Sequence, residues 1–432
     1  MSAPRTIPLP TYLTPLLTLF PPDTHDHIFL VGGTVRDILL AQTAQDIDLV
    51  VALSAEALKN LGFRRVQPKS AAPIFFRFHE SLGKIEVTSI ESPLDLEADL
   101  RRRDFSANAL ALSLTGDFVD PLDGYSALQH RELHACSDAT FISDPLRVFR
   151  AFRFEADGWQ MTPATEELIR ERKWSEAFSL LPMERFSREM LRALGSKDPA
   201  RFFRRMIEFE IGREFLPEIF LMQEIPAGPK EHHPEGDLLT HSLQVMERVC
   251  GVTSEVVTRF CALFHDLGKL ATSTERYPKH HGHDEAGFRS SRPFCDRLAL
   301  PVVFRTALGW VNRLHTTANR WEELRTGTKI KLAEQAVRGG ISERLPLVAV
   351  ADKPDGVGML DWDSAVWVVQ LPTAELGIDP RLLAPVPIEG IVPLSPEQRS
   401  SFIHQKRVEM FRSVVKKNES SEKNRFDTRD RF

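Results

Sequence analysis

Two glycines and two aspartates near the start of the chain have the types and spacing of a nucleotide site. Gly32 and Gly33 follow one apolar run, and Asp46 and Asp48 take alternate positions at the start of another. Side chains on a strand alternate between faces, so Asp46 and Asp48 point the same way. A divalent cation stabilises two such carboxylates, and a glycine turn before a helix N-terminus suits a phosphate. The pattern predicts nucleotidyl transfer from a metal-bound nucleoside triphosphate.

Further charged side chains recur at regular spacing later in the chain. Residues 102–108 supply two guanidiniums, a carboxylate and an amide, and Asp144 precedes Arg147 and Arg150 at intervals of three. An Asp–Arg pair one helical turn apart could offer an acceptor and donors to a base edge, while Arg150 could meet a phosphate. Taken singly, Asp144 could be a helix cap and the arginines surface charges. The order of the pieces favours a site.

A second set of chemically active side chains is spread over the later half of the chain. It consists of His241, the pair His265-Asp266, and Asp352. Imidazoles and carboxylates together suit a divalent metal ion. An isolated His-Asp pair is more often a structural hydrogen bond, so this set is weak on spacing alone.

The elements that must position these residues divide the chain into an α/β part and a helical part. Short apolar runs predict strands at Ile28–Val31, Ile47–Val51, Ile74–Phe78, Ile85–Ile90 and Ala109–Leu114. They indicate an α/β unit with a small mixed sheet. From Asp144 onward the pattern is mainly helical, and residues 225–234 read as a linker.

We therefore expect four regions along the chain. They are an α/β head over residues 1–130, an all-α neck over 131–225, a second all-α domain over 226–370, and a C-terminal helical tail over 371–432. An amphipathic helix is predicted around Pro396–Val415. The charged segment Lys416–Phe432 is predicted to be disordered.

Composition sets the broad class of protein. The 432 residues carry a net charge of −5 and a hydrophobic fraction of 42%, which suits a globular protein of two or three domains. No long apolar run predicts a membrane span, and residues 1–10 lack a signal-peptide pattern. Four scattered cysteines favour a reducing cytoplasm. Arginine clusters in the first half leave open either a basic groove or solvated helix faces.

Six motifs in fixed order make residues 28–220 resemble the class II tRNA nucleotidyltransferases and bacterial poly(A) polymerases. The motifs are Gly-Gly-x-Val-Arg-Asp (32–37), Asp-x-Asp (46–48), Arg-Arg-Asp-Phe-x-x-Asn-Ala (102–109), Asp-Pro-x-x-Gly (120–124), Asp-Pro-Leu-Arg-x-x-Arg (144–150) and Glu-Arg-x-x-x-Glu (184–189). The resemblance implies a template-independent enzyme that adds CMP and AMP to the 3′ end of tRNA, with tRNA, CTP and ATP as its partners.

The resemblance also implies roles for individual residues. Asp46 and Asp48 would be catalytic, holding Mg²⁺ on the triphosphate and helping to activate the primer 3′-hydroxyl. Nucleotide binding would fall to Gly32, Gly33, Arg36, Arg103, Asp104, Asn108, Asp144, Arg147 and Arg150. Within that set, Asp144 and Arg147 would read the incoming base. Glu86 is a weaker candidate for a third carboxylate.

Two departures from the family pattern keep other activities open. The acidic residue usual before Asp144 is Ser143 here, and only residues 89–100 separate the Glu86 strand from Arg102. Related enzymes that add only CC lack the longer loop of this region, so CC-only addition is an alternative. A poly(A) polymerase shares every head motif. An RNA-binding protein with a decayed site is the third alternative.

The strings Leu-Thr-His-Ser-Leu, Phe-His-Asp-Leu-Gly-Lys and His-His-Gly-His resemble an HD phosphohydrolase domain, which is fused to the transferase in a group of bacterial enzymes. The resemblance implies metal ligands at His241, His265, Asp266 and Asp352, with His281 and His315 near the phosphate or water. Nickel, magnesium and manganese are the candidate ions. Such domains hydrolyse phosphomonoesters and 2′,3′-cyclic phosphodiesters, although a domain that only holds tRNA would share the fold.

Overall fold

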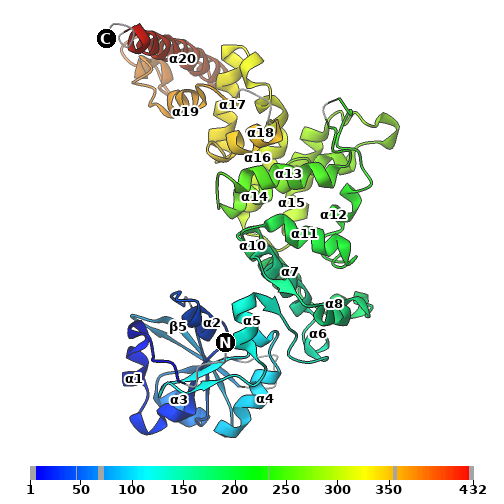
Figure 1. Ribbon diagram of the computed structural model, residues 1–432. Coiled ribbons are helices and arrows are strands. Elements are labelled where there is room, and N and C mark those ends of the chain that lie inside the picture. The colour runs from blue at the N-terminus through cyan, green and yellow to red at the C-terminus, as the bar shows by residue number, and fades with distance from the viewer. Residues whose placement is uncertain (1–5, 45, 67–72, 232, 354–357, 428–432) are drawn as a thin grey trace. The chain divides into compact units, whose positions relative to one another are not determined.

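The computed structural model describes residues 6–44, 46–66, 73–231, 233–353 and 358–427. The chain separates into two compact units, Met1–Leu181 and Pro182–Phe432. Figure 1 draws the strands in the first unit, whereas the second is built from helices. Each unit is described by itself.

A seven-stranded mixed sheet organises the first unit. Its strands are β1 (Ile28–Val31), β2 (Ile47–Val51), β3 (Arg64–Val66), β4 (Ile74–His79), β5 (Gly83–Ser89), β6 (Ala111–Ser113) and β7 (Phe118–Val119). They lie in the order β3-β4-β5-β2-β1-β6-β7. β2 and β5 are parallel, and every other pair in this sheet is antiparallel. The mixed α/β head predicted from the sequence is thereby confirmed.

Short helices surround this sheet and lead out of it. They are α1 (Pro15–Leu19), α2 (Gly33–Leu39), α3 (Ala55–Asn60), α4 (Leu96–Arg101), α5 (Gly124–His130), α6 (Thr140–Ser143), α7 (Leu146–Ala156), α8 (Pro163–Arg170) and α9 (Ser175–Ser179). Turns of 3₁₀ helix lie at Thr11–Leu13, Pro22–His27, Pro93–Asp95 and Ser106–Asn108. A two-stranded parallel pair, β8 (Glu132–Leu133) and β9 (Gln160–Met161), completes the unit.

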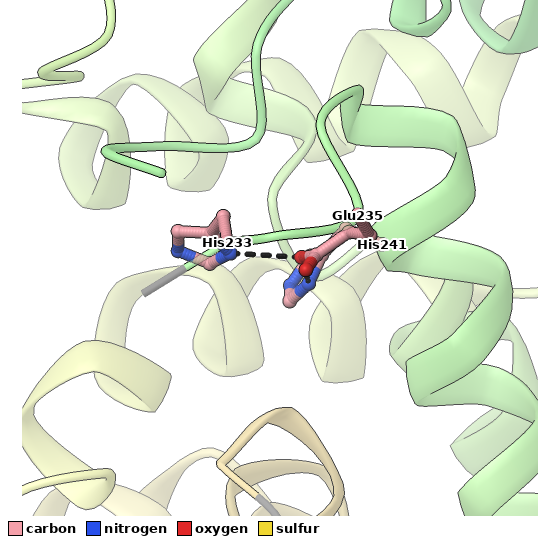
Figure 2. Close-up of side chains that lie close together, drawn as sticks. All are labelled: His233, Glu235 and His241. Carbon is pink, nitrogen blue, oxygen red and sulfur yellow. Dashed lines mark hydrogen bonds and ion pairs between the residues drawn. The ribbon is translucent and has the colours of Figure 1, made fainter. Parts of the chain in front are cut away.

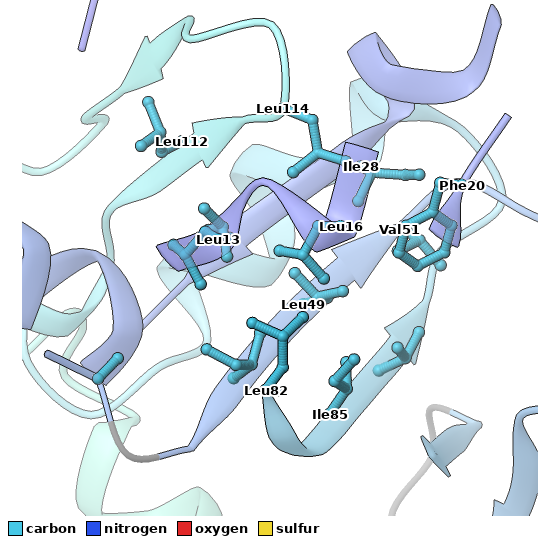
Figure 3. Packing of buried hydrophobic residues seen from close by; sticks show 14 of the residues in the cluster. Leu13, Leu16, Phe20, Ile28, Leu49, Val51, Leu82, Ile85, Leu112 and Leu114 are labelled. Atoms are coloured by element: carbon cyan, nitrogen blue, oxygen red, sulfur yellow. The ribbon is translucent and has the colours of Figure 1, made fainter. Parts of the chain in front are cut away.

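The two faces of the sheet have different cores because strand side chains alternate. On one face, Leu49 and Ile85 pack with Leu13, Leu16 and Phe20 from the N-terminal helical turns (Figure 3). On the other face, residues of β1, β2 and β6 pack with Leu96 and Leu100 of α4. Asp48 lies between Leu49 and Ile47 in sequence, and alternation therefore places it on the α4 face.

Helices α10–α20 form the second unit. They are α10 (Met183–Leu194), α11 (Pro199–Glu208), α12 (Pro217–Met222), α13 (Leu238–Cys250), α14 (Val256–Leu263), α15 (His283–Arg297), α16 (Val302–Ala318), α17 (Thr326–Arg338), α18 (Arg344–Asp352), α19 (Trp362–Gln370) and α20 (Pro396–Asp427). Turns of 3₁₀ helix lie at Leu267–Ala271, Thr274–Arg276, Trp321–Glu323 and Pro380–Leu383. Among the described helices, none has the length and apolarity that crossing a bilayer requires.

The structure corrects the sequence-based expectation at three places. The strand predicted at Ala109–Leu114 is reduced to β6, because residues 106–108 form a 3₁₀ turn. The short edge strands β3 and β7 were not expected. The tail predicted to be disordered from Lys416 continues α20 through Asp427, since Lys, Glu and Arg favour helix, and residues 428–432 lie outside the described part. The bounds of the four regions given above stay predictions.

Candidate nucleotide-transfer and metal sites

Three carboxylates gather where β2 and β5 run side by side. Asp46 precedes β2, Asp48 lies within it, and Asp48 pairs with Glu86 of β5, so these two side chains share a face. Burial raises the pKa of Asp48, and the charges of Glu86 and Asp46 raise it further, against the lowering effect of Arg103. Burial and like charge therefore disfavour the ionised form of Asp48, and a divalent cation would offset both effects.

A glycine turn brings a helix and a guanidinium to the same place. Gly32 follows β1 with a φ of +64°, a backbone conformation that favours glycine. A Cβ there would lie 2.7 Å from Nη1 of Arg103 and would displace that guanidinium from the backbone. The hydroxyl of Thr34 accepts from the amide of Asp48 at 2.9 Å and donates to the carbonyl of Asp46 at 3.1 Å. The first turn of α2 is thus attached directly to the carboxylate strand.

A partly buried polar network connects Arg36 and Arg150 through Asn108 and Asp104. Arg36 donates to Asn108 Oδ1 at 2.9 Å, Asn108 donates to Asp104 at 3.1 Å, and Arg150 Nη2 lies 2.7 Å from Asp104 Oδ2. Burial alone would raise the pKa of Asp104, but Arg150 and the hydrogen bonds from Asn108 and the Phe105 amide outweigh it and lower that pKa to about 2. Asp104 is therefore ionised and holds Arg150 and Asn108 in place.

The predicted base-reading pair is arranged differently from a shared helix face. Helix α7 begins at Leu146, whose amide donates to Asp144 Oδ1 at 3.2 Å, so Asp144 precedes the helix. Arg147 donates to the Thr140 carbonyl at 3.0 Å and to the Arg102 carbonyl at 2.6 Å. It also donates to the Ser143 hydroxyl at 3.1 Å. Ser143, the departure from the family motif, thus helps to orient Arg147.

In the second unit, helix ends and helix faces bring histidines and aspartates together. His241 lies on α13, His265 and Asp266 follow α14, His315 lies on α16, and Asp352 ends α18. His241 Nε2 is 2.9 Å from Asp352 Oδ1, and His265 Nε2 is 3.2 Å from Asp266 Oδ2 and 3.4 Å from Asp352 Oδ1. His315 Nε2 is 3.3 Å from Asp266 Oδ1. Residues about 110 positions apart in sequence therefore share one centre, which borders a cavity of about 780 Å³.

This donor set fits a metal ion. In the described structure, Nε2 of His241, Nε2 of His265 and Oδ1 of Asp266 are buried, and their contacts with the opposite charges lack hydrogen-bond geometry. Their groupings could hold a cation. Burial alone would lower the pKa of His265, but Asp266 and Asp352 outweigh it and raise the pKa to about 10. The same negative charges would favour a metal cation.

Sequence reasoning missed four neighbours of this centre and misplaced one. His283 Nε2 lies 3.3 Å from Asp266 Oδ1, whereas His281 is exposed at the turn before α15 and does not line the cavity. His283, and not His281, therefore faces the centre. Lys269, three residues after Asp266, has its Nζ 2.6 Å from Asp266 Oδ2 and donates to the Ala227 carbonyl.

Glu235 and His233 extend the centre outward (Figure 2). Oε1 of Glu235 lies 2.7 Å from Nδ1 of His241 and 3.0 Å from Nδ1 of His233. A carboxylate that accepts from Nδ1–H fixes the imidazole tautomer and leaves Nε2 as the ligand atom. The signal in the sequence was the acidic residue six positions before His241.

Comparisons with known proteins extend over both units. The family models that match are the poly A polymerase head domain (residues 28–134), the probable RNA and SrmB-binding site of polymerase A (158–222) and the HD domain (238–355). The solved CCA-adding enzyme of Bacillus stearothermophilus, in complex with CTP, has a TM-score of 0.63 at 20% identity and covers 96% of this chain and 100% of its own. That likeness concerns the fold.

Relatives in sequence are closer. The multifunctional CCA protein of Hahella chejuensis is 32% identical over 354 residues, which cover 78% of this chain and 83% of the relative. The multifunctional CCA protein of Methylococcus capsulatus is 33% identical over 390 residues, which cover 84% and 90%. With the head, neck and HD models matched in the same order, the chain belongs to the family of multifunctional CCA proteins.

Proposed function

We propose that the head adds CMP and AMP to the 3′ end of tRNA by metal-dependent nucleotidyl transfer, without a nucleic-acid template. The observation that carries this proposal is the pairing of Asp48 with Glu86 on a strand that is hydrogen-bonded to Thr34, two residues after Gly32, whose backbone lies against Arg103. The relatives' name and the resemblance of six motifs support it. A tRNA substrate and four free cysteines favour the cytoplasm as its compartment.

Each part of the site has a task in this reaction. Asp46 and Asp48 would hold Mg²⁺, which supplies charge neutralisation for the triphosphate and lowers the pKa of the attacking hydroxyl. The Gly32–Gly33 turn and the start of α2 accept the phosphates, with Arg36 and Arg103 beside them. Asp104 holds Arg150 by an ion pair. Asp144 and Arg147 offer acceptor and donor groups to the base, so that protein groups select C and A.

A second candidate is addition of CC only. The connection from β5 to Arg102 contains a 3₁₀ turn, Pro93–Asp95, and α4, with a capping box between Ser92 and Asp95. This connection is short and regular, and enzymes of the resembling family that stop after CC lack a long loop there. The nucleotide-addition experiment described below distinguishes CCA addition from CC addition.

The second unit is proposed to hydrolyse phosphomonoesters and 2′,3′-cyclic phosphodiesters. His241, His265, Asp266 and Asp352 would hold nickel, magnesium or manganese, which supplies an activated water. His283, His315 and Lys269 line the same cavity and would contact the phosphate oxygens. Glu235 would keep the His241 ring in the tautomer that a metal requires.

Nucleotide addition to a defined tRNA end tests the head. A transcript ending at the discriminator base is incubated with CTP alone, ATP alone and both together, with wild type and with Asp46→Asn. Full CCA addition requires two C residues with CTP and a terminal A when ATP is also present. Arrest after CC establishes the second candidate, and long A tracts without CTP reject both. Incorporation that survives Asp46→Asn rejects the metal site.

Hydrolysis of 2′,3′-cyclic AMP tests the second unit. The wild type is assayed after chelation and after addition of nickel, magnesium or manganese one at a time, which identifies the ion. His265→Ala is expected to lose turnover with each ion. His281→Ala is the matched control, because this histidine is exposed at the edge of the same region. Equal turnover by wild type and His265→Ala rejects the hydrolase.

A further inference from the structure

The α4 face of the sheet continues past the carboxylates onto strands β5, β4 and β3. Strand pairing places Asp48 opposite Glu86, Glu86 opposite Phe76, and Phe76 opposite Arg64. Residues paired across neighbouring strands point to the same face, so these four side chains form one row. With strands about 4.8 Å apart, Phe76 lies roughly 10 Å from Asp48 along this row.

A second row runs beside the first and is also aromatic and basic. Phe78 pairs with Lys84, two residues along from the Phe76–Glu86 pair. The rings of Phe76 and Phe78 meet edge to face with centroids 6.0 Å apart. Phe78 is 71% exposed, and Arg64 is exposed as well. A hollow of about 620 Å³ is lined by both rings and Arg64, and also by Arg77 and residues 60–62.

Large exposed aromatic side chains beside cations are unusual on a sheet face, because burial of a ring is normally favourable. Phe75, the residue before Phe76, faces the opposite side of the sheet, is 2% exposed and belongs to the core. Strand β4 thus has a phenylalanine at three of four consecutive positions, of which Phe75 is buried, Phe76 is half-buried and Phe78 is exposed. The other two remain available to a ligand.

The in-line geometry of nucleotidyl transfer indicates which ligand would lie here. In nucleotidyl transfer the attacking hydroxyl and the leaving pyrophosphate lie in line on opposite sides of the reacting phosphorus. Gly32 follows β1, which adjoins β2 on the side away from β5, so the elements proposed to hold the triphosphate lie on the β1 side of Asp48. An RNA end that attacks in line would then approach over β5 and β4.

On this basis, which rests on the proposed function of the head, we infer that Phe76 and Phe78, with Arg64 and Lys84, form a shelf that stacks the last bases of the single-stranded RNA primer. Bases stack on aromatic rings whatever their identity, and basic side chains attract the phosphates between them. Lys84 lies 2.6 Å from Glu86 and so joins the shelf to the carboxylate cluster. The shelf would hold the primer while its 3′-hydroxyl is at the metal.

Binding of RNA without turnover tests the shelf. A fluorescein-labelled tRNA transcript that ends at the discriminator base is titrated with protein in the absence of nucleotide. Phe78→Ala is expected to weaken binding about tenfold, since each stacked base contributes substantially. Phe78→Trp should bind within about twofold of wild type because it retains a ring. Leu94→Ala removes another exposed side chain of the head, 90% exposed, and should change nothing.

A second titration separates stacking from a structural effect. The same transcript with an abasic residue at its 3′ terminus should bind wild type as weakly as the intact transcript binds Phe78→Ala. Phe78→Ala should then lose nothing more with the abasic transcript. In turnover, Phe78→Ala should raise KM for tRNA and leave KM for CTP unchanged. If Phe78→Ala instead weakens binding of the abasic transcript by the same factor as binding of the intact transcript, Phe78 does not stack that base and the inference fails.

The outcomes for the shelf and for the proposed function are distinguishable. A wild type that adds no nucleotide rejects the transferase, while the affinity of Phe78→Ala for RNA still decides the shelf. A wild type that adds nucleotides, with unchanged affinity and KM in Phe78→Ala, rejects the shelf alone. The exposed rings would in that case be left for a protein partner.

Discussion

Asp48 lies where burial and two neighbouring carboxylates favour its neutral form, with Arg103 acting in the opposite direction. Such a carboxylate is expensive to keep charged unless a cation is bound, so it serves a ligand more than it serves the fold.

Asp48→Asn should therefore remove activity without loss of stability. We expect nucleotide incorporation to fall by roughly 10²- to 10³-fold, since a group that stabilises transition-state charge is lost. The thermal midpoint should stay the same or rise, because the amide relieves repulsion with Asp46 and Glu86. Differential scanning fluorimetry and incorporation of labelled CMP measure the two effects. Asp23→Asn, an exposed carboxylate of the head, is the control.

The pKa of Asp104 is lowered, whereas that of Asp48 is raised. Its pKa is about 2 in the folded protein, against 3.8 for the isolated group, so folding is stabilised while the carboxylate is charged. This contribution is present above pH 4 and is lost as pH falls from about 4 to about 2. It amounts to about 2 kcal/mol.

Asp104→Asn should remove this pH dependence from the head. At pH 7 we expect faster hydrogen exchange in peptides spanning residues 102–110 than in wild type, because the Phe105 amide and the Arg150 guanidinium lose a charged acceptor. The difference should shrink as pH approaches 3. A difference that is independent of pH would show that the ion pair does not carry the effect.

Glu235 allows a test of how the second site is oriented. Glu235→Gln keeps the size of the side chain but removes the charge that faces Nδ1 of His241 at 2.7 Å. Metal affinity measured by calorimetry should fall about 10- to 100-fold. Nucleotide addition should not change. Glu231→Gln, four residues earlier and exposed at the same cavity, should retain the metal.

At the scale of elements, one face of β2 packs in the core and the other carries the catalytic carboxylate. Leu49 is 1% exposed in the core shown in Figure 3, whereas Asp48, one residue away, faces the site. A shift of one residue in the pairing of β2 would turn Asp48 toward this core and Leu49 toward the α4 face. Core packing therefore fixes the direction of the catalytic carboxylate.

Leu49→Ala should destabilise the head by about 3 kcal/mol, from lost apolar burial and the cavity left behind. Limited proteolysis at increasing temperature should show earlier cleavage within residues 1–181. Below the onset of this cleavage, KM for CTP should remain near that of wild type, because Asp48 keeps its register. Val66→Ala, on an exposed edge strand, should have little effect on either quantity.

At the scale of the whole molecule, the two sites are built within separate compact units. Asp46 belongs to the first unit, and all of the His and Asp side chains of the metal centre belong to the second. Among the described residues assigned to the two sites, each site draws its metal-binding side chains from one unit.

The two activities should consequently be separable by single substitutions. Asp46→Asn should abolish nucleotide addition and leave hydrolysis of 2′,3′-cyclic AMP within about twofold of wild type, and His265→Ala should do the reverse. The independence expected here follows the general additivity of distant sites. Loss of both activities in either variant, with the fold intact by circular dichroism, would show that the two sites are coupled.

The sequence by itself determined the main strands and the order of the sites. Apolar runs bounded by glycine and polar residues located β1, β2, β4 and β5 closely, because hydrophobic alternation is a local property. The same local logic found the Asp46–Asp48 pair and the His265-Asp266 pair. It was wrong at Lys416–Asp427, where composition suggested disorder and helix propensity prevailed.

Only the tertiary structure decided which distant side chains meet. Sequence spacing does not reveal that Glu86 lies opposite Asp48, that His283 rather than His281 faces Asp266, or that Glu235 reaches His241. These contacts depend on strand register and on the rotation of helices about their axes, both of which are set by long-range packing of the cores. The physical reason is that the local sequence constrains only residues close together along the chain. Residues far apart in sequence meet in a site only after packing of the cores has fixed the position and rotation of each strand and helix.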